Sequence, residues 1–230
     1  MVIGIGDSMI NFDFGFMLEV FPRIIKYVHI TLGISIIAMF IGLIIGTIIA
    51  LIRKFEIRGL KYFAKVYVSF FRGTPLLVQL FLLYYGLPQI FPSLASMNAY
   101  VAAYVGLSLN SAAYIAEVIR GAINSIDKGQ MEACLSIGMT KGQAMRRIIL
   151  PQATRVAIPA LGNTFIGIIK ESSLAFTLGV SEMLSQAKLA AAASYRFFEC
   201  YLVVALIYWM ITIVFSFLQG KLEARFNKAY

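Results

Sequence analysis

An uncharged run of 23 residues, from Ile30 to Ile52, constrains this chain more than any other feature of its sequence. At about 1.5 Å per residue, a helix of this length measures roughly 35 Å and crosses a hydrocarbon core of about 30 Å. The whole chain is 60% hydrophobic and only 13% charged, whereas soluble domains carry about 25% charged residues. We therefore predict an integral membrane protein and exclude a soluble globular domain.

Four further apolar segments predict additional membrane spans. They cover residues 62–87, 98–122, 157–178 and 198–218. Together with the first span, over residues 30–52, they predict an all-α polytopic membrane helix bundle that forms one domain over residues 1–230. Four or six spans remain alternatives to five, because the third and fourth segments contain charged residues. We interpret residues 1–29 as an outer, interfacial segment, since its phenylalanines suit the headgroup region of a membrane.

Basic residues indicate which connections face the cytoplasm. They outnumber acidic residues in residues 53–65, in residues 120–155 and in the tail after residue 218, whereas residues 86–97 carry no charge. Cytoplasmic connections of membrane proteins carry an excess of Lys and Arg, so we predict the N-terminus outside and the C-terminus inside. The net charge of +9 is then mainly a consequence of topology, and we expect no nucleic-acid partner.

The longest cytoplasmic connection predicts two short helices. Ser125 or Asp127 is placed to cap the first helix, and Gly138 is placed to end it with a left-handed turn. Thr140 is placed to cap the second helix, which Pro151 is expected to stop. An amphipathic loop that lies on the bilayer is the alternative interpretation.

The same connection contains a spaced motif. From residue 132 the sequence follows the pattern E-A-A, three residues, G, nine residues, I-x-L-P, with a cysteine in place of the second alanine. The matching residues are Glu132, Ala133, Gly138, Ile148, Leu150 and Pro151. This pattern resembles the coupling signature of permease subunits in bacterial ABC importers. The resemblance implies that residues 125–151, the cytoplasmic knob, bind a groove on an ATPase subunit and transmit its closure to the membrane helices.

Three more segments resemble the polar-amino-acid branch of those permeases, which includes importers of histidine, glutamine, arginine and cystine. They are FFRGTPLLVQLFLLYYGLP at residues 70–88, AAYIAEVIRGAINSIDKGQ at residues 112–130 and IIKESSLAF at residues 168–176. The resemblance implies an importer subunit in a bacterial cell membrane. Its implied partners are ABC ATPase subunits that hold ATP and Mg²⁺, a second permease subunit, identical or related, an extracytoplasmic binding protein and an amino-acid substrate.

We expect no enzymatic activity and no cofactor on this chain itself. The phosphate-binding motif G-x-x-x-x-G-K-[ST] is absent from the sequence, so ATP is not expected to bind by that route. One histidine and two cysteines argue against a metal site, and no nucleophile–histidine–acid set can be assembled. The alternative function is an ion-coupled secondary amino-acid transporter, although such proteins usually contain repeated halves, and we find no internal repeat.

Eight polar residues in the predicted spans are candidates for a substrate pathway, because polar side chains in a membrane usually face the bundle interior. They are Arg72, Asn110, Glu117, Asn163, Lys170, Glu171, Ser172 and Ser173. Arg72 either contributes to gating or pairs with a substrate carboxylate, or it extends to the membrane interface as an ordinary anchor. Glu117 either faces the pathway or pairs with Arg120, three residues later. Residues 170–173 either form a turn at the outer mouth or contact the substrate's ammonium group.

A helix break is predicted inside the second span, at Gly73. Thr74 is a good N-cap, and Pro75 is favoured at the first position of a helix. A helix from Pro75 to about Tyr85 is too short to cross a membrane alone, since a crossing needs about 20 residues. The second span is therefore predicted to be broken, with Arg72 on its cytoplasmic half.

Overall fold

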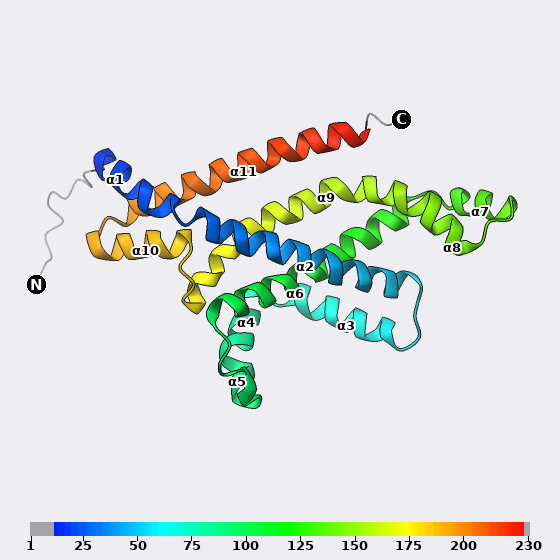
Figure 1. Cartoon of the computed structure of the whole chain (residues 1–230), viewed down its shortest axis with the longest axis horizontal. Coiled ribbons are helices and arrows are strands. Elements are labelled where there is room, and N and C mark those ends of the chain that lie inside the picture. Colours follow the sequence, from blue (N-terminus) through cyan, green and yellow to red (C-terminus); the bar gives the residue numbers. More distant parts are fainter. Residues whose placement is uncertain (1–11, 228–230) are drawn as a thin grey trace, which may run out of the picture.

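The computed structural model describes residues 12–227, which form an elongated helical molecule (Figure 1). The α-helices are α1 (Phe14–Ile25), α2 (Val28–Lys54), α3 (Leu60–Gly73), α4 (Leu76–Phe81), α5 (Leu87–Ile90), α6 (Ala99–Ser125), α7 (Lys128–Ser136), α8 (Lys141–Ala144), α9 (Leu150–Glu171), α10 (Met183–Ser194) and α11 (Phe197–Asn227). Two π-helical turns and two 3₁₀ turns connect them: η1 (Leu82–Gly86), η3 (Met145–Ile149), η2 (Pro92–Leu94) and η4 (Ser172–Leu178). Regular structure in residues 12–227 is entirely helical, which confirms the predicted all-α class.

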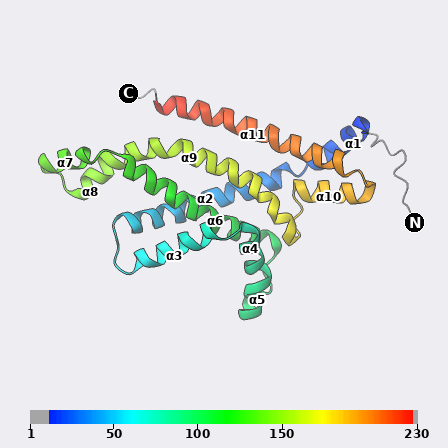
Figure 2. The same cartoon turned by 180° about the vertical axis from the view of Figure 1, so that it is seen from behind.

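Helices α2 and α6 lie side by side at the centre of the molecule. Helix α9 packs against both, α3 packs against both on another side, and α11 packs against α9. Seen from behind, α6 runs in front of α2, between α9 and α3 (Figure 2). This arrangement places the polar residues of α6 against three neighbouring helices.

Three described helices are long and apolar enough to cross a membrane: α2, α6 and the segment Phe197–Arg225 of α11. The pair Leu60–Gly73 and Leu76–Ile90 makes a fourth if it is one span, and it is bent by 110° at the break. These four elements coincide with four of the five predicted spans. The remaining predicted span, residues 157–178, falls on α9 and η4, which are outside this set of candidates, so five spans and their orientation remain a prediction.

Small residues let α2 and α6 approach closely. A side chain at Gly46 would place its Cβ 2.8 Å from the carbonyl oxygen of Ala112 and 2.8 Å from the side chain of Ile115. At Gly42, a Cβ would lie 2.5 Å from the hydroxyl oxygen of Ser111. That hydroxyl donates a hydrogen bond to the backbone of α2 at 3.2 Å. Two glycines four residues apart are typical of close helix contacts in membranes, and here they hold the two central helices together.

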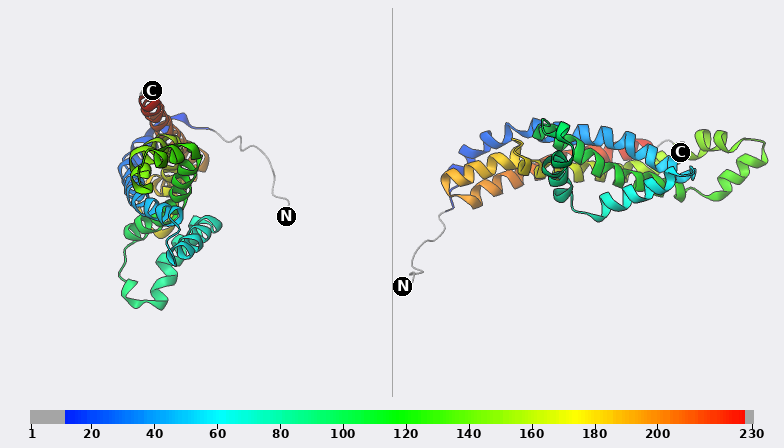
Figure 3. Two further views of the ribbon diagram at one scale, coloured as in Figure 1. Left: turned by 90° about the vertical axis from the view of Figure 1, so that its right-hand side faces the viewer. Right: turned by 90° about the horizontal axis from the view of Figure 1, so that it is seen from below.

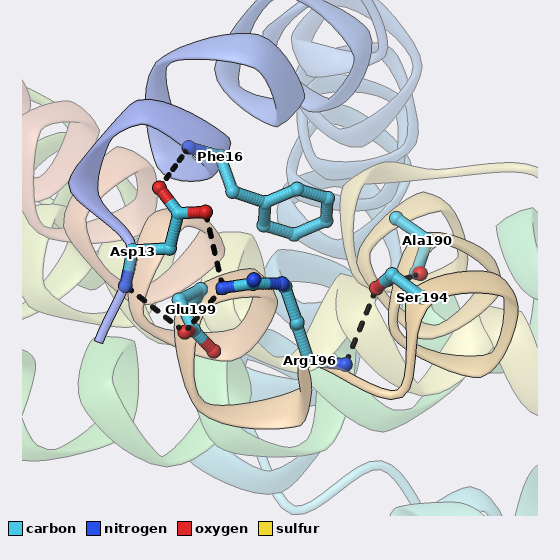
Figure 4. A network of polar contacts seen from close by, with 6 residues as sticks. All are labelled: Asp13, Phe16, Ala190, Ser194, Arg196 and Glu199. Atoms are coloured by element: carbon cyan, nitrogen blue, oxygen red, sulfur yellow. Dashed lines mark hydrogen bonds and ion pairs between the residues drawn. The ribbon is translucent and has the colours of Figure 1, made fainter. Parts of the chain in front are cut away.

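Helix α1 is tied to the turn between α10 and α11 by a polar network (Figure 4). The Asp13 carboxylate caps α1 by accepting a hydrogen bond from the Phe16 N–H at 2.9 Å, and it pairs with Arg196 at 3.2 Å. Arg196 also lies 3.4 Å from Glu199, whose carboxylate accepts a hydrogen bond from the Asp13 N–H. Helix α1 buries its inner face against α10 and α11. The described part of the predicted interfacial segment is thus a packed helix, and residues 1–11 lie outside the described residues.

Different helices form the two ends of the elongated molecule. Helices α7 and α8 extend from one end, beyond the turn between α2 and α3, and α1 and α10 lie at the opposite end (Figure 3). Helices α4 and α5 project sideways from the bundle (Figure 1). The length of the central helices therefore separates the knob, residues 125–151, from the α1–α10 region.

We predict that Gly46→Ala lowers the thermal stability of the protein in detergent. The added Cβ meets a backbone oxygen that cannot move without shifting α6, and such overpacking costs about 1–3 kcal/mol. Gly33→Ala, also in α2, is the matched control because its Cβ would have no neighbour within 4 Å. Equal melting temperatures for the two variants would contradict the proposed role of Gly46.

Candidate functional site

The knob, residues 125–151, contains two helices with the predicted caps. The Asp127 carboxylate accepts a hydrogen bond from the Gly129 N–H at 2.6 Å and caps α7. Gly138 ends that helix with φ of 81°, in the left-handed region where a side chain is strained. Thr140 and Gln143 form a reciprocal capping box at the start of α8. The interpretation as a helix pair is confirmed for α7 and the start of α8.

The predicted stop at Pro151 is wrong. Helix α8 passes into the π-helical turn η3 and then into α9, so one helical path runs from Lys141 to Glu171. A proline removes one backbone hydrogen bond and clashes with the carbonyl four residues earlier, which lies within η3. The wider π-helical turn accommodates this clash without breaking the path. The second helix of the knob is therefore continuous with α9, which packs against α2, α6 and α11.

The motif residues of the knob divide between its surface and its base. Glu132, Ala133 and Gly138 are exposed on or next to α7, and the side chain of Ile137 beside them is 78% exposed. Cys134, at the position of the expected alanine, is buried. The remaining motif residues lie at the base, where Ile148 and Leu150 are half-buried and Pro151 is exposed. Buried side chains of α6, η3 and α9 pack together below them: Ala122, Ile123, Met145, Ile149, Ala153 and Ala157.

The break between α3 and α4 is stabilised by amide side chains from two helices. Gln79 of α4 donates hydrogen bonds to the carbonyl oxygens of Phe71 and Thr74, each at 3.0 Å. The Asn110 amide of α6 donates to the Gln79 side chain at 2.9 Å and to the Phe71 carbonyl at 3.2 Å. These bonds satisfy backbone carbonyls that the bend leaves without helical partners, as a low-dielectric surrounding requires.

Helix α3 ends at Gly73, where the break was predicted, but the cap of the next helix was assigned to the wrong residue. Helix α4 begins at Leu76, with Pro75 at the N-cap position, and no side chain caps it. The Thr74 hydroxyl instead donates to the Phe70 carbonyl at 2.8 Å, at the end of α3. Thr74 thus serves the helix before it, because its backbone is extended and its hydroxyl points back along α3.

Glu117 of α6 lies among three arginines. Its carboxylate pairs with Arg53 of α2 and with Arg120 one turn away at 2.6 Å, and Arg72 of α3 lies 3.9 Å from it. The Arg72 guanidinium also lies over the ring of Tyr114, 5.6 Å from its centre. The pairing interpretation of Glu117 with Arg120 is therefore confirmed, and the pair is part of a larger arginine cluster that joins α2, α3 and α6.

A small cavity of about 160 Å³ lies between α6 and α9. Its lining residues are Asn110, Ser111 and Tyr114 of α6 and Thr164, Gly167, Ile168 and Glu171 of α9. Ligand pockets usually measure about 300–1,000 Å³, so this cavity is smaller than a complete ligand site. It brings together two of the eight predicted pathway residues, Asn110 and Glu171, with Arg72 next to its Tyr114 wall.

The other predicted pathway residues lie apart from this cavity. Asn163 and Lys170 are exposed on α9 and do not line it. The hydroxyls of Ser172 and Ser173 donate to the carbonyls of Ile169 and Lys170 at 2.8 and 2.7 Å. Residues 170–173 therefore form the end of α9 and the first turn of η4, and their predicted location at the outer mouth stays a prediction.

Several polar residues of this region were not predicted from the sequence, among them Gln79, Thr164 and Arg53. Gln79 carries a detectable signal, since it is the lone amide in the apolar run from Leu76 to Tyr85. Thr164 gives a weaker signal, because threonine is common in membrane helices and its hydroxyl bonds its own helix. Arg53 ends a predicted span and reads as an ordinary cytoplasmic anchor, so only the fold shows that it contacts Glu117.

Comparisons with known proteins agree with one another. The family model described as binding-protein-dependent transport system inner membrane component matches residues 42–228. The probable amino-acid permease protein YxeN of Bacillus subtilis is 56% identical over 222 residues, covering 96% of this chain and 99% of that protein. The probable amino-acid ABC transporter permease protein PatM of Vibrio harveyi is 54% identical over 220 residues, with the same coverage. A chain from the crystal structure of an amino acid ABC transporter with histidines is 40% identical, with a TM-score of 0.87 over 94% of this chain and 99% of that chain.

We predict that Glu117→Gln lowers the free energy of unfolding by about 1–3 kcal/mol, because it removes the carboxylate that three partly exposed guanidinium groups share. The control is Glu56→Gln, which removes the exposed partner of Lys61 and is expected to cost less than about 1 kcal/mol. Thermal unfolding in detergent measures both. A Glu117→Gln variant as stable as the control would show that the cluster does not hold the three helices together.

Proposed function

The chain belongs to the family of binding-protein-dependent transport system inner membrane components, as an ABC-transporter permease for polar amino acids, and on this premise we propose how it works. It is a multi-pass membrane protein of five spans, with its N-terminus outside and its C-terminus inside a bacterial cell membrane. Two such subunits, identical or related, line one path for an amino acid that an extracytoplasmic binding protein delivers. Two ATPase subunits, which hold ATP and Mg²⁺, bind the cytoplasmic knobs and drive import.

The continuous helical path from the knob to the cavity is the observation that carries this proposal. Helix α8 runs through η3 into α9 without an end, and α9 supplies Thr164 and Glu171 to the cavity wall. A knob that rotates with its ATPase therefore tilts α9 against α6 and changes the cavity between them. Such coupling requires that the rigid α8–α9 path has two positions, and that ATP binding to the ATPase favours one of them while substrate binding depends on which one is adopted.

The charges around the cavity suit a zwitterion. Glu171 lines it on α9, and Arg72 lies against Tyr114 on its α6 side. We propose that Glu171 contacts the substrate ammonium group and that Arg72 contacts the substrate carboxylate. Of the three arginines around Glu117, Arg72 lies farthest from its carboxylate. The small volume of the cavity supports a path that becomes complete only with the second permease subunit or after α9 has moved.

Charge reversal on the knob tests the coupling step. We expect Glu132→Arg to abolish ATP-driven uptake in proteoliposomes and to reduce co-purification of the ATPase, because Glu132 is exposed on the docking helix. Glu19→Arg, an equally exposed reversal at the opposite end of the molecule, is expected to leave both unchanged. Full ATP-driven uptake by the Glu132→Arg variant would contradict the docking assignment, and uptake that follows an ion gradient without ATP would instead favour a secondary transporter.

A second experiment tests the cavity. We expect Glu171→Gln to raise the KM for the imported amino acid about tenfold while ATPase co-purification stays normal, because one charge-assisted hydrogen bond to the substrate is lost. Glu223→Gln, which changes an acidic residue on α11 outside the cavity, is the matched control. An unchanged KM in the Glu171→Gln variant would remove Glu171 from the pathway.

A further inference from the structure

The turn between α2 and α3 holds an ordered set of basic residues. Two left-handed residues, Glu56 with φ of 51° and Gly59 with φ of 82°, reverse the chain between the helices. The Lys61 N–H donates to the Ile57 carbonyl at 3.0 Å and closes the turn onto the start of α3. Arg58 is exposed at the tip. We call residues 55–65 the basic turn.

The positive charge of the basic turn is largely uncompensated. The ammonium groups of Lys61 and Lys65 lie 5.5 and 5.9 Å from the centre of the same Tyr62 ring, so they converge on one patch. Lys61 pairs with Glu56 at 3.7 Å, but the Glu56 side chain is 77% exposed, so solvent weakens this pair. No carboxylate of residues 12–225 forms an ion pair with Arg58 or Lys65.

Exposed apolar side chains border these charges. Helix α3 buries Ala64 and Val68 against its neighbours, and it leaves Phe63 77% and Val66 68% exposed. Lys61 and Lys65 are four residues apart and share a helical face, which lies between the buried face and the exposed apolar face. A helix with a basic face beside an exposed apolar face is suited to the boundary between lipid headgroups and acyl chains.

The position of the basic turn fits that boundary. It follows directly after Lys54, the last residue of the candidate span α2. The cytoplasmic knob reaches farther from the bundle at the same end of the molecule (Figure 1). The basic turn therefore lies at the level where the membrane ends, while the knob stands clear of it.

We propose that the basic turn binds the headgroup of an anionic phospholipid. The lipid phosphate lies between Lys61 and Lys65 beside Tyr62, Arg58 approaches it from the tip, and an acyl chain runs along Phe63 and Val66. Basic residues directly cytoplasmic to a membrane helix attract anionic lipids, with roughly a fivefold gain in affinity for each Lys or Arg near the surface. The site depends on the membrane placement of α2 and does not depend on import by this chain.

Native mass spectrometry of the full chain in detergent tests this proposal. Phosphatidylglycerol and phosphatidylcholine with identical acyl chains are titrated in turn, and the fraction of lipid-bound protein is measured. We expect the wild-type chain to bind phosphatidylglycerol more tightly than phosphatidylcholine. In the double variant Lys61→Gln, Lys65→Gln we expect about 20-fold weaker binding of phosphatidylglycerol, since two charges are removed, and unchanged binding of phosphatidylcholine.

Three comparisons keep the result specific. Lys128→Gln with Lys141→Gln removes two exposed charges from the knob and is expected to leave lipid binding unchanged. Lys61→Arg with Lys65→Arg keeps the charge and is expected to restore binding, which separates loss of the site from loss of folding. Equal phosphatidylglycerol binding by the wild-type chain and the Gln double variant overturns the proposal. Displacement of the lipid by an equal concentration of inorganic phosphate overturns it as well, because the site then takes free anions.

The same variants distinguish a lipid from a protein partner. If the Gln double variant binds phosphatidylglycerol normally but no longer co-purifies with its ATPase, the basic turn belongs to a protein interface and the lipid assignment is wrong. If it loses phosphatidylglycerol binding while it retains the ATPase, the lipid assignment holds whether or not the knob assignment does.

Discussion

The need to pair every polar group away from water controls how this molecule is built. Glu117 holds α2, α3 and α6 together because its carboxylate faces guanidinium groups from each of them. Asn110 and Gln79 stabilise the break between α3 and α4, because their side-chain amides donate hydrogen bonds to the backbone carbonyls that the bend exposes. In a bilayer, neither a lone charge nor an open helix end is tolerated unless protein surrounds it. The polar residues of α6 therefore have a structural role: they hold α2, α3 and α4 in position, whether or not they also contact substrate.

We propose that α9 is the element that transmits motion. It shares a cavity with α6 and continues without interruption from the knob through a π-helical turn. The arginine cluster and the Gly42–Gly46 contact hold α2, α3 and α6 as one unit. An ABC permease needs one part that is rigid and one part that moves with its ATPase, and these two groups of helices fit those roles.

Residue patterns predicted the local features well and the contacts between distant segments poorly. The first span, the caps at Asp127 and Thr140 and the left-handed turn at Gly138 follow from short-range rules, and the structure confirms them. The predicted helix end at Pro151 was wrong because a proline usually ends a helix, whereas here the preceding π-helical turn accommodates it and the helix continues. The links from Glu117 to Arg53 and from Asn110 to Gln79 join residues 64 and 31 positions apart, and no local rule predicts such partners.

Coupling in this protein requires that the knob and α9 move as a single body against α2. Spin labels at Ile137 on the knob, Val156 on α9 and Ile48 on α2, all at exposed positions, test it by double electron–electron resonance in the complex with the ATPase. We expect the distance between positions 137 and 156 to stay constant when ATP is added, while the distance between positions 156 and 48 changes. A change between 137 and 156 with a constant distance between 156 and 48 would show that the knob moves alone, and the proposed coupling through α9 would be wrong.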